Sequence, residues 1–190
     1  PVIGMVGLLE NINQSTTIEF KGAGDFIVTL GALNGCLGGS EYLRTIHGKI
    51  QGPIPHLNLE LEMGIQELCL EAIKKGIIKS AHDLSDGGLA VNISESIVHS
   101  KQGLGARLDV VRKLQNNELL FGECQSVIVV TLEESALYEL ILLAQKLDMH
   151  TQTIGRVTDT NSLVINDQIN ISRIKMENAY FNSLEKIMTQ

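Results

Sequence analysis

The stretch SAHDLSDGGLA, from Ser80 to Ala90, joins an apolar run to a segment with helical periodicity. Gly87 and Gly88 permit positive φ and let the backbone come close to a neighbour or a ligand. An apolar run, a glycine turn and a helical pattern in this order indicate a strand-to-helix connection. The same short stretch holds a histidine, two aspartates and two serines. It therefore predicts both a fold element and a candidate site.

Helical and strand patterns alternate on either side of this stretch. Leu61, Ile65, Leu68 and Ala72 recur at helical spacing, and Gly76 is typical of a helix end. We expect further helices at about 40–46, 89–98, 133–149 and 176–188, and strands at about 26–30, 77–84, 106–111 and 126–132. The irregular alternation predicts an α/β (α+β mixed) fold, with a mixed β-sheet layered with helices.

Two further strand predictions concern the ends of the chain. The almost wholly apolar residues 2–9 are predicted to form a buried strand. Residues 151–157 and 162–166 are predicted to pair as a hairpin across the polar turn TDTN.

Composition limits the possible functions. The chain has 190 residues, 44% of them hydrophobic, and a formal net charge of −7, with scattered lysines and arginines. No nucleic-acid-binding stripe is expected, and no apolar run approaches the roughly 18 residues of a membrane span. The three cysteines lie far apart without metal-binding spacing, which favours buried thiols in a reducing, cytoplasmic setting. A phosphate-bearing small molecule fits this composition, because backbone amides and a metal bind phosphate without a basic surface.

The residues of the opening stretch allow two interpretations. In one, Asp83 ligates Mg²⁺ and Ser85 donates its hydroxyl to a phosphate, since Mg²⁺ combines one or two carboxylates with phosphate oxygens and water. In the other, an aspartate or serine caps the following helix, Gly87 and Gly88 form a turn, and His82 is partly buried. Asp86 is the candidate for the cap.

Two other stretches allow the same pair of interpretations. In LGGSEYL, residues 37–43, the glycines precede Ser40, which either caps a short helix or faces a phosphate. In LLFGECQSVIVV, residues 119–130, Glu123 and Gln125 precede a strand, where they bind a ligand or satisfy loop amides. Cys124 has no histidine nearby in the sequence to activate it.

Taken in order, LGGSEYLRTIHG, SAHDLSDGGLAV and LLFGECQS resemble the C-terminal domain of the phosphoribosylformylglycinamidine synthase family, within the AIR-synthetase-related superfamily. The opening PVIGMVGLLE resembles the last strand of that family's preceding ATP-binding-type domain, and YFNSLEKIM its terminal helix. The resemblance thus implies that residues 1–20 are the end of the preceding domain and a linker. Residues 21–190 would form the C-terminal domain.

The resemblance implies a part of an enzyme that uses ATP and glutamine-derived ammonia to amidate formylglycinamide ribonucleotide in purine biosynthesis. It implies Asp83 as a Mg²⁺ ligand and Ser85 as a contact to ATP or ADP, at an auxiliary site that does not turn over. The implied partners are the rest of the synthase chain, a glutamine amidotransferase subunit and a small accessory subunit. The family's catalytic residues lie in earlier domains, so we expect this chain to be inactive alone.

One departure from the family pattern weakens the expectation of a second ligand site. The segment Glu123-Cys124-Gln125 matches a Glu-Ser-Gln triplet that binds the ribonucleotide in the first copy of the domain. Because a thiol is a weaker hydrogen-bond donor than a hydroxyl, we leave these residues outside the predicted site. Two alternatives stay open: a purely structural or interaction module of the same enzyme, or a domain of another ATP-dependent enzyme of the superfamily.

Overall fold

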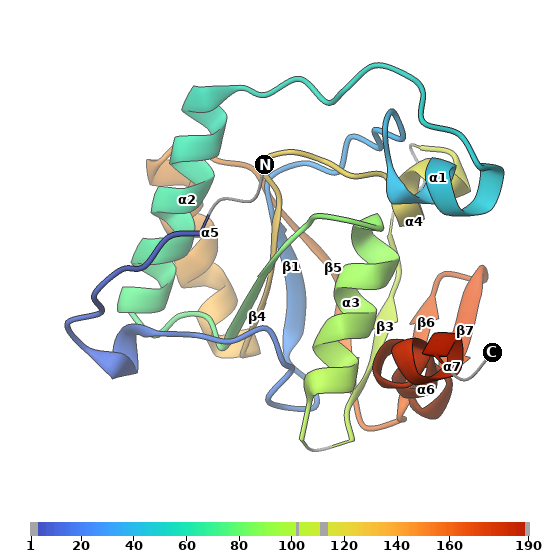
Figure 1. Cartoon of the computed structure of the whole chain (residues 1–190). Helices are drawn as coiled ribbons and strands as arrows, with labels where there is room; N and C mark the ends of the chain where they lie inside the picture. The colour runs from blue at the N-terminus through green and yellow to red at the C-terminus, as the bar shows by residue number, and fades with distance from the viewer. Residues whose placement is uncertain (1–3, 102, 111–113, 189–190) are drawn as a thin grey trace.

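The computed structural model describes residues 4–101, 103–110 and 114–188, and within them seven strands form one sheet (Figure 1). The strands are β1 (Phe26–Leu30), β2 (Ser80–Asp83), β3 (Gly105–Leu108), β4 (Ile128–Leu132), β5 (Thr151–Thr158), β6 (Ser162–Ile165) and β7 (Ile169–Ser172). Their order across the sheet is β2-β4-β1-β5-β3-β6-β7. The β3–β6 pair is parallel and the other pairs are antiparallel, which confirms the predicted mixed sheet.

Helices cover both faces of this sheet (Figure 1). They are α1 (Glu41–His47), α2 (Leu59–Lys74), α3 (Gly88–His99), α4 (Asn116–Phe121), α5 (Leu137–Lys146), α6 (Arg173–Phe181) and α7 (Ser183–Met188), with short 3-10 turns at Ile12–Gln14 and Glu134–Ala136. Helices α3, α4 and α6 pack on one face, and α2 and α5 pack on the other.

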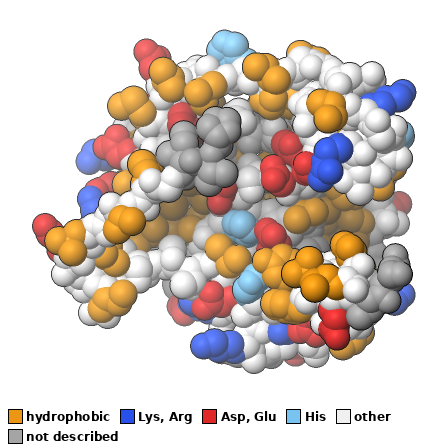
Figure 2. Space-filling model, viewed as in Figure 1, with side chains coloured by type: hydrophobic (Ala, Val, Ile, Leu, Met, Phe, Trp, Pro, Cys, Tyr) orange, Lys and Arg blue, Asp and Glu red, His pale blue; other side chains and the backbone are white. Residues whose placement is uncertain are grey.

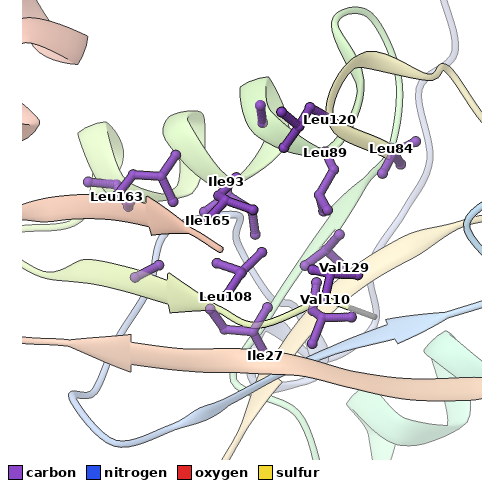
Figure 3. Packing of buried hydrophobic residues seen from close by; sticks show 14 of the residues in the cluster. Ile27, Leu84, Leu89, Ile93, Leu108, Val110, Leu120, Val129, Leu163 and Ile165 are labelled. Carbon is purple, nitrogen blue, oxygen red and sulfur yellow. The ribbon is translucent and has the colours of Figure 1, made fainter. Parts of the chain in front are cut away.

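Each face has its own apolar core, because successive strand residues point to opposite sides. On β1, Ile27 joins the core under α3, whereas Val28 joins the core under α2 and α5. Figure 3 shows the first core, in which Leu89 and Ile93 of α3 approach Leu108 of β3 and its neighbours. The sheet therefore contributes one of its faces to each of the two cores.

Local sequence signals explain the ends of the predicted helices. Asn58 caps α2 by accepting hydrogen bonds from the backbone N–H groups of Glu60 and Leu61. Past the end of α2, Gly76 adopts a φ of +68°, the left-handed conformation expected of a terminating glycine. Ser40 caps α1 in the same way through the N–H of Leu43, which confirms that prediction.

The predicted hairpin between residues 151–157 and 162–166 is wrong. Strand β3 lies between β5 and β6, pairing antiparallel with the first and parallel with the second. On its other side, β6 pairs antiparallel with β7; neither β7 nor α4 was predicted from the sequence. Alternation of apolar and polar residues shows that a segment is extended, but it does not show which strand lies beside it.

The N-terminal segment also differs from its prediction. Residues 1–3 of the expected strand lie outside the described residues, and residues 4–9 are exposed and form no strand. Figure 2 shows apolar side chains on the arm at the left of this view, where Figure 1 places this segment. A strand needs a neighbouring strand for its backbone hydrogen bonds, and residues 4–9 pair with none of the described strands.

The segment joins the body further along the chain. Thr17 forms a parallel bridge with Ser80 at the outer edge of β2, and Phe20 is buried in the core under α3. The boundary expected after residue 20 stays a prediction. The expected terminal helix at 176–188 is present as two helices, α6 and α7.

Candidate functional site

The opening stretch of the sequence forms one wall of a cavity at the end of the sheet. Strand β2 ends at Asp83, which pairs with Ile128, the first residue of the antiparallel β4. The segment that follows β2 and the segment that precedes β4 therefore lie close together at the same end of the sheet. The first half of α2 closes the other side around a volume of about 380 Å³. The lining residues are Glu62, Ile65, Gln66, Asp83, Leu84, Ser85, Asp86, Glu123, Cys124, Gln125, Ser126, Val127 and Ile128.

The cavity brings the predicted site residues together. Asp83 and Ser85 both line it, with Glu123 and Gln125 from a stretch about forty residues further along the chain. The Asp83 side chain is 76% exposed, so its carboxylate is available to a ligand. Asp86 also lines the cavity but does not cap α3, because the N-cap residue is Gly87, which has no side chain to form a cap.

The charge of the cavity decides what it can accept. Four of its lining residues are carboxylates, and its described lining includes no lysine, arginine or histidine. A bare phosphate would be repelled there, whereas a Mg²⁺ ion between carboxylate and phosphate removes the repulsion.

The donor set fits a shared Mg²⁺ ion rather than a site made by this chain alone. The described residues contain no group of three or more histidine, cysteine, aspartate or glutamate side chains placed to hold one metal ion. The exposed Asp83 carboxylate could supply one ligand, as is usual for Mg²⁺ bound with phosphate and water.

Helix α3 fixes the end of β2 from behind. Asn92 is 2% exposed and its Nδ2 donates to the carbonyl oxygen of Asp83 at 2.8 Å. His82 is mostly buried, and its Nε2 lies 2.8 Å from Oε2 of Glu95 on the same helix. Neither Asn92 nor Glu95 was predicted from the sequence. A signal was present for Asn92, since it is a polar residue one position before the core residue Ile93.

The glycine pair is required by close packing. Gly87 and Gly88 have φ values of +80° and +67°, and a Cβ on Gly88 would lie 2.7 Å from the carbonyl carbon of Phe121. Only glycine combines this conformation with this approach. The turn brings the start of α3 against the end of α4.

The Glu123 carboxylate is engaged by the protein itself. Its Oε1 accepts from the N–H of Glu41 at 2.8 Å and from the N–H of Gly87 at 2.9 Å. These amides lie at the starts of α1 and α3, whose unpaired N–H groups attract negative charge. Of the two interpretations left open for Glu123, the structure supports satisfaction of loop amides.

The neighbouring Cys124 has a similar role. Its buried sulfur accepts from the N–H groups of Asn34 and Gly35 at 3.3 and 3.2 Å. Together, Glu123 and Cys124 join the 34–41 loop, the 85–88 turn and the approach to β4. The loop that contains LGGSEYL thus supports the cavity without lining it.

The other two cysteines do not line the cavity, although the carbonyl oxygen of Cys36 accepts a hydrogen bond from the N–H of Glu123 at 2.8 Å. Cys69 is a buried residue of α2, and burial raises the pKa of its thiol to about 11. Cys36 is partly exposed. None of the helices in the described ranges combines the length and apolar character needed to cross a membrane.

Residues 22–168 match the family model described as "AIR synthase related protein, C-terminal domain". The chain belongs to this family. Curated relatives of this AIR synthase related domain include the phosphoribosylformylglycinamidine synthase subunit PurL of Alkaliphilus metalliredigens, 48% identical over 133 residues, and that of Moorella thermoacetica, 40% identical over 156 residues. The first match covers 70% of this chain and 18% of the relative, the second 82% and 21%. The chain therefore spans about a fifth of these relatives.

Solved structures confirm the fold of the domain. Thermotoga maritima PurL complexed with FGAR superposes with a TM-score of 0.72 at 18% identity, covering 87% of this chain and 30% of the other. Thermotoga maritima PurL complexed with ATP gives 0.68 at 17% identity, covering 87% and 28%. These likenesses support the predicted layered α/β architecture.

Proposed function

We propose that this domain is the C-terminal part of a phosphoribosylformylglycinamidine synthase, the ATP-dependent ligase that amidates formylglycinamide ribonucleotide with glutamine-derived ammonia. The relatives that cover most of the chain carry that enzyme's name, and several exceed a third in identity. The chain corresponds to a small share of their length. Its function is accordingly to complete a larger enzyme, and it is inactive alone.

The role we propose for the cavity is to form one wall of an auxiliary Mg²⁺–nucleotide site that does not turn over. The observation that carries this proposal is the convergence of Asp83 and Ser85 on a single acidic cavity with Glu123 and Gln125. Asp83 would hold Mg²⁺, and Ser85 would donate its hydroxyl to a phosphate of ADP or ATP. A bound Mg²⁺ would neutralise phosphate charge beside the carboxylates. The structures of Thermotoga maritima PurL complexed with ATP and with ADP support a nucleotide as the ligand class.

The remaining walls of the site would come from preceding domains of the same polypeptide. The exposed apolar segment at residues 4–9 supports this, because it is suited to a sheet of such a domain, with residues up to about 20 as its linker. Further partners would be a glutamine amidotransferase subunit and a small accessory subunit, in the cytoplasm. The structure of PurLQS from Thermotoga maritima supports an assembly of several subunits.

The test compares wild-type full-length enzyme with Asp83→Asn, with Asp159→Asn as an exposed control in the β5–β6 turn. Mg²⁺ with ADP at a hundredfold excess over Kd should stabilise the wild type and the control by about 2.7 kcal/mol. Asp83→Asn should lose most of this stabilisation in a thermal melt. Unchanged stabilisation would refute the site. Amidation by the isolated 190-residue chain would refute the proposal that it is inactive alone.

A second function is a structural or interaction module without a ligand. One observation favours it: the described residues form no three-ligand metal group of their own. In that case Asp83→Asn would match the wild type in all nucleotide-dependent measurements. A third possibility, another enzyme of the superfamily, would be decided by the residues that precede position 1 in the full polypeptide.

A further inference from the structure

Two peptide bonds beside the cavity are chemically vulnerable. Of the 18 glycines, only Gly35 and Gly87 follow an asparagine or an aspartate, in Asn34–Gly35 and Asp86–Gly87. Asn34 and Asp86, the residues that precede these two glycines, are both exposed. A glycine nitrogen is unusually free to attack the preceding side chain, because no glycine side chain obstructs the approach.

The reaction at each bond is a cyclisation followed by hydrolysis. The glycine nitrogen bonds to Cγ of the preceding residue and gives its proton to solvent, forming a five-membered succinimide. Ammonia leaves from Asn34, whereas water leaves from Asp86. Water then opens the ring at either carbonyl, giving aspartate or isoaspartate. The net change is hydrolysis of the amide at Asn34 and rearrangement at Asp86, with no oxidant or reductant.

In the folded protein, the nitrogen that must attack is held in both cases by a hydrogen bond. The N–H of Gly35 donates to Sγ of Cys124 at 3.2 Å, and the N–H of Gly87 donates to Oε1 of Glu123 at 2.9 Å. The two acceptors are adjacent residues. One short segment thus holds both vulnerable nitrogens, although Gly35 and Gly87 are far apart in sequence.

Neighbouring side chains lie close to the same two glycines. A Cβ on Gly35 would lie 2.9 Å from Cδ1 of Leu114, and one on Gly87 would lie 2.5 Å from Cγ2 of Val91. Both glycines have positive φ, at +70° and +80°. Because each glycine N–H is held by its hydrogen bond, the attack requires a local opening that breaks this bond.

We propose that Asn34–Gly35 and Asp86–Gly87 are latent modification sites, and that Cys124 and Glu123 protect them by holding the attacking nitrogens. When the 122–125 segment moves away, cyclisation begins. At Asp86, which lines the cavity, isoaspartate lengthens the backbone and displaces a carboxylate. At Asn34, the product adds a negative charge to the loop that supports the cavity. This inference does not depend on the proposed function.

Cys124 and Glu123 each hold a different glycine nitrogen, so each variant serves as a control for the other. Cys124→Ala, Glu123→Ala and wild type are incubated at neutral pH, and peptide mapping by mass spectrometry measures aspartate and isoaspartate at both bonds. Loss of one hydrogen bond should raise the rate about fivefold at its own bond, Asn34 for Cys124→Ala and Asp86 for Glu123→Ala. The other bond in the same protein should keep its wild-type rate. Glu123→Gln, which retains an acceptor oxygen, should restore most of the protection.

Two references complete the design. Cys69→Ala removes a buried thiol elsewhere and should change neither rate. Wild-type chain unfolded in urea should react faster than the folded chain at both bonds. Equal rates in folded and unfolded chain, or acceleration of both bonds by both variants, would overturn specific protection. A slower reaction at Asp86 in Glu123→Ala would overturn it too, because it would make Glu123 a base that assists the attack.

Discussion

Polar side chains secure β2 at both ends. Before its start, Nζ of Lys79 lies 2.8 Å from Oδ1 of the buried Asp25 and 2.9 Å from Oε1 of Glu133. At its end, Asn92 binds the carbonyl oxygen of Asp83. These contacts fix the strand that delivers Asp83 to the cavity, so single residues determine the geometry of the candidate site.

Lys79→Met should destabilise the domain by about 3 kcal/mol at neutral pH, because it leaves the Asp25 carboxylate buried without its cation. Burial lowers the pKa of Lys79, but hydrogen bonds to Asp25 and Glu133 outweigh it, and the pKa is raised overall. Lys79 therefore contributes stability below about pH 10 and loses it as pH rises through the raised pKa. Urea unfolding across alkaline pH should show a flatter profile for the variant.

Glu133, the exposed acidic residue of the same cluster, has the opposite effect on the pH dependence of stability. A hydrogen bond from Lys79 lowers the pKa of Glu133, so Glu133 contributes stability above about pH 4 and loses it as pH falls. Lys74→Met is the control, because it removes only an exposed pair with Glu71 and should leave the urea midpoint close to that of the wild type. Equal effects of the two lysine variants would contradict a structural role for the buried pair.

Asn92→Ala should cost about 1–3 kcal/mol, because it leaves the carbonyl oxygen of Asp83 without its buried donor. Ser94→Ala, on the same helix, removes only a bond to the nearby carbonyl of Ala90 and should be close to neutral. Urea midpoints measure both. If Asn92→Ala is as stable as Ser94→Ala, the amide does not hold the strand end.

At the scale of elements, local signals predicted helices better than strand partners. Helix α2 follows from the spacing of Ile65 and Leu68 and from its glycine stop, all within one segment of the chain. The insertion of β3 between β5 and β6 depends on contacts about fifty residues apart, which no local pattern contains. The hairpin prediction failed for this reason.

The candidate site shows the same division. Asp83 and Ser85 were identifiable because they stand within one strand-turn-helix pattern, and the structure places both on the cavity. The hydrogen bonds of Glu123 to Glu41 and Gly87 were not, since they join three separate loops. Sequence thus identified residues that line the cavity, and only the fold identified those that hold the loops.

The start of α3 offers a test of close packing against backbone conformation. Gly88→Ala and Gly76→Ala introduce the same methyl group at nearly equal φ, +67° and +68°. Around Gly76 there is open space, so strain alone should cost about 1–2 kcal/mol. At Gly88 the methyl group also meets backbone of Phe121, so the loss in thermal unfolding should be clearly larger. Equal losses would show that α4 yields freely and that the approach is not tight.

At the scale of the whole molecule, the two cores are coupled through the sheet that they share. Leu68 of α2 lies in one core and Leu89 of α3 in the other, and both are fully buried. Neighbouring residues of β1 and β4 alternate between the cores, as Ile27 and Val28 do. Neither core can lose its sheet face while the other keeps it, so the domain should unfold as one unit.

Leu68→Ala and Leu89→Ala should therefore each cost about 2–5 kcal/mol and lower the stability of both cores together. Native-state hydrogen exchange provides the measurement, with slowly exchanging amides of α2 and α3 as separate reporters. In either variant, global exchange in both helices should accelerate by the same factor. Acceleration confined to the substituted side would show two independently unfolding layers. The double variant should be additive within about 0.5 kcal/mol, because the two side chains lie on opposite faces of the sheet and share no contact.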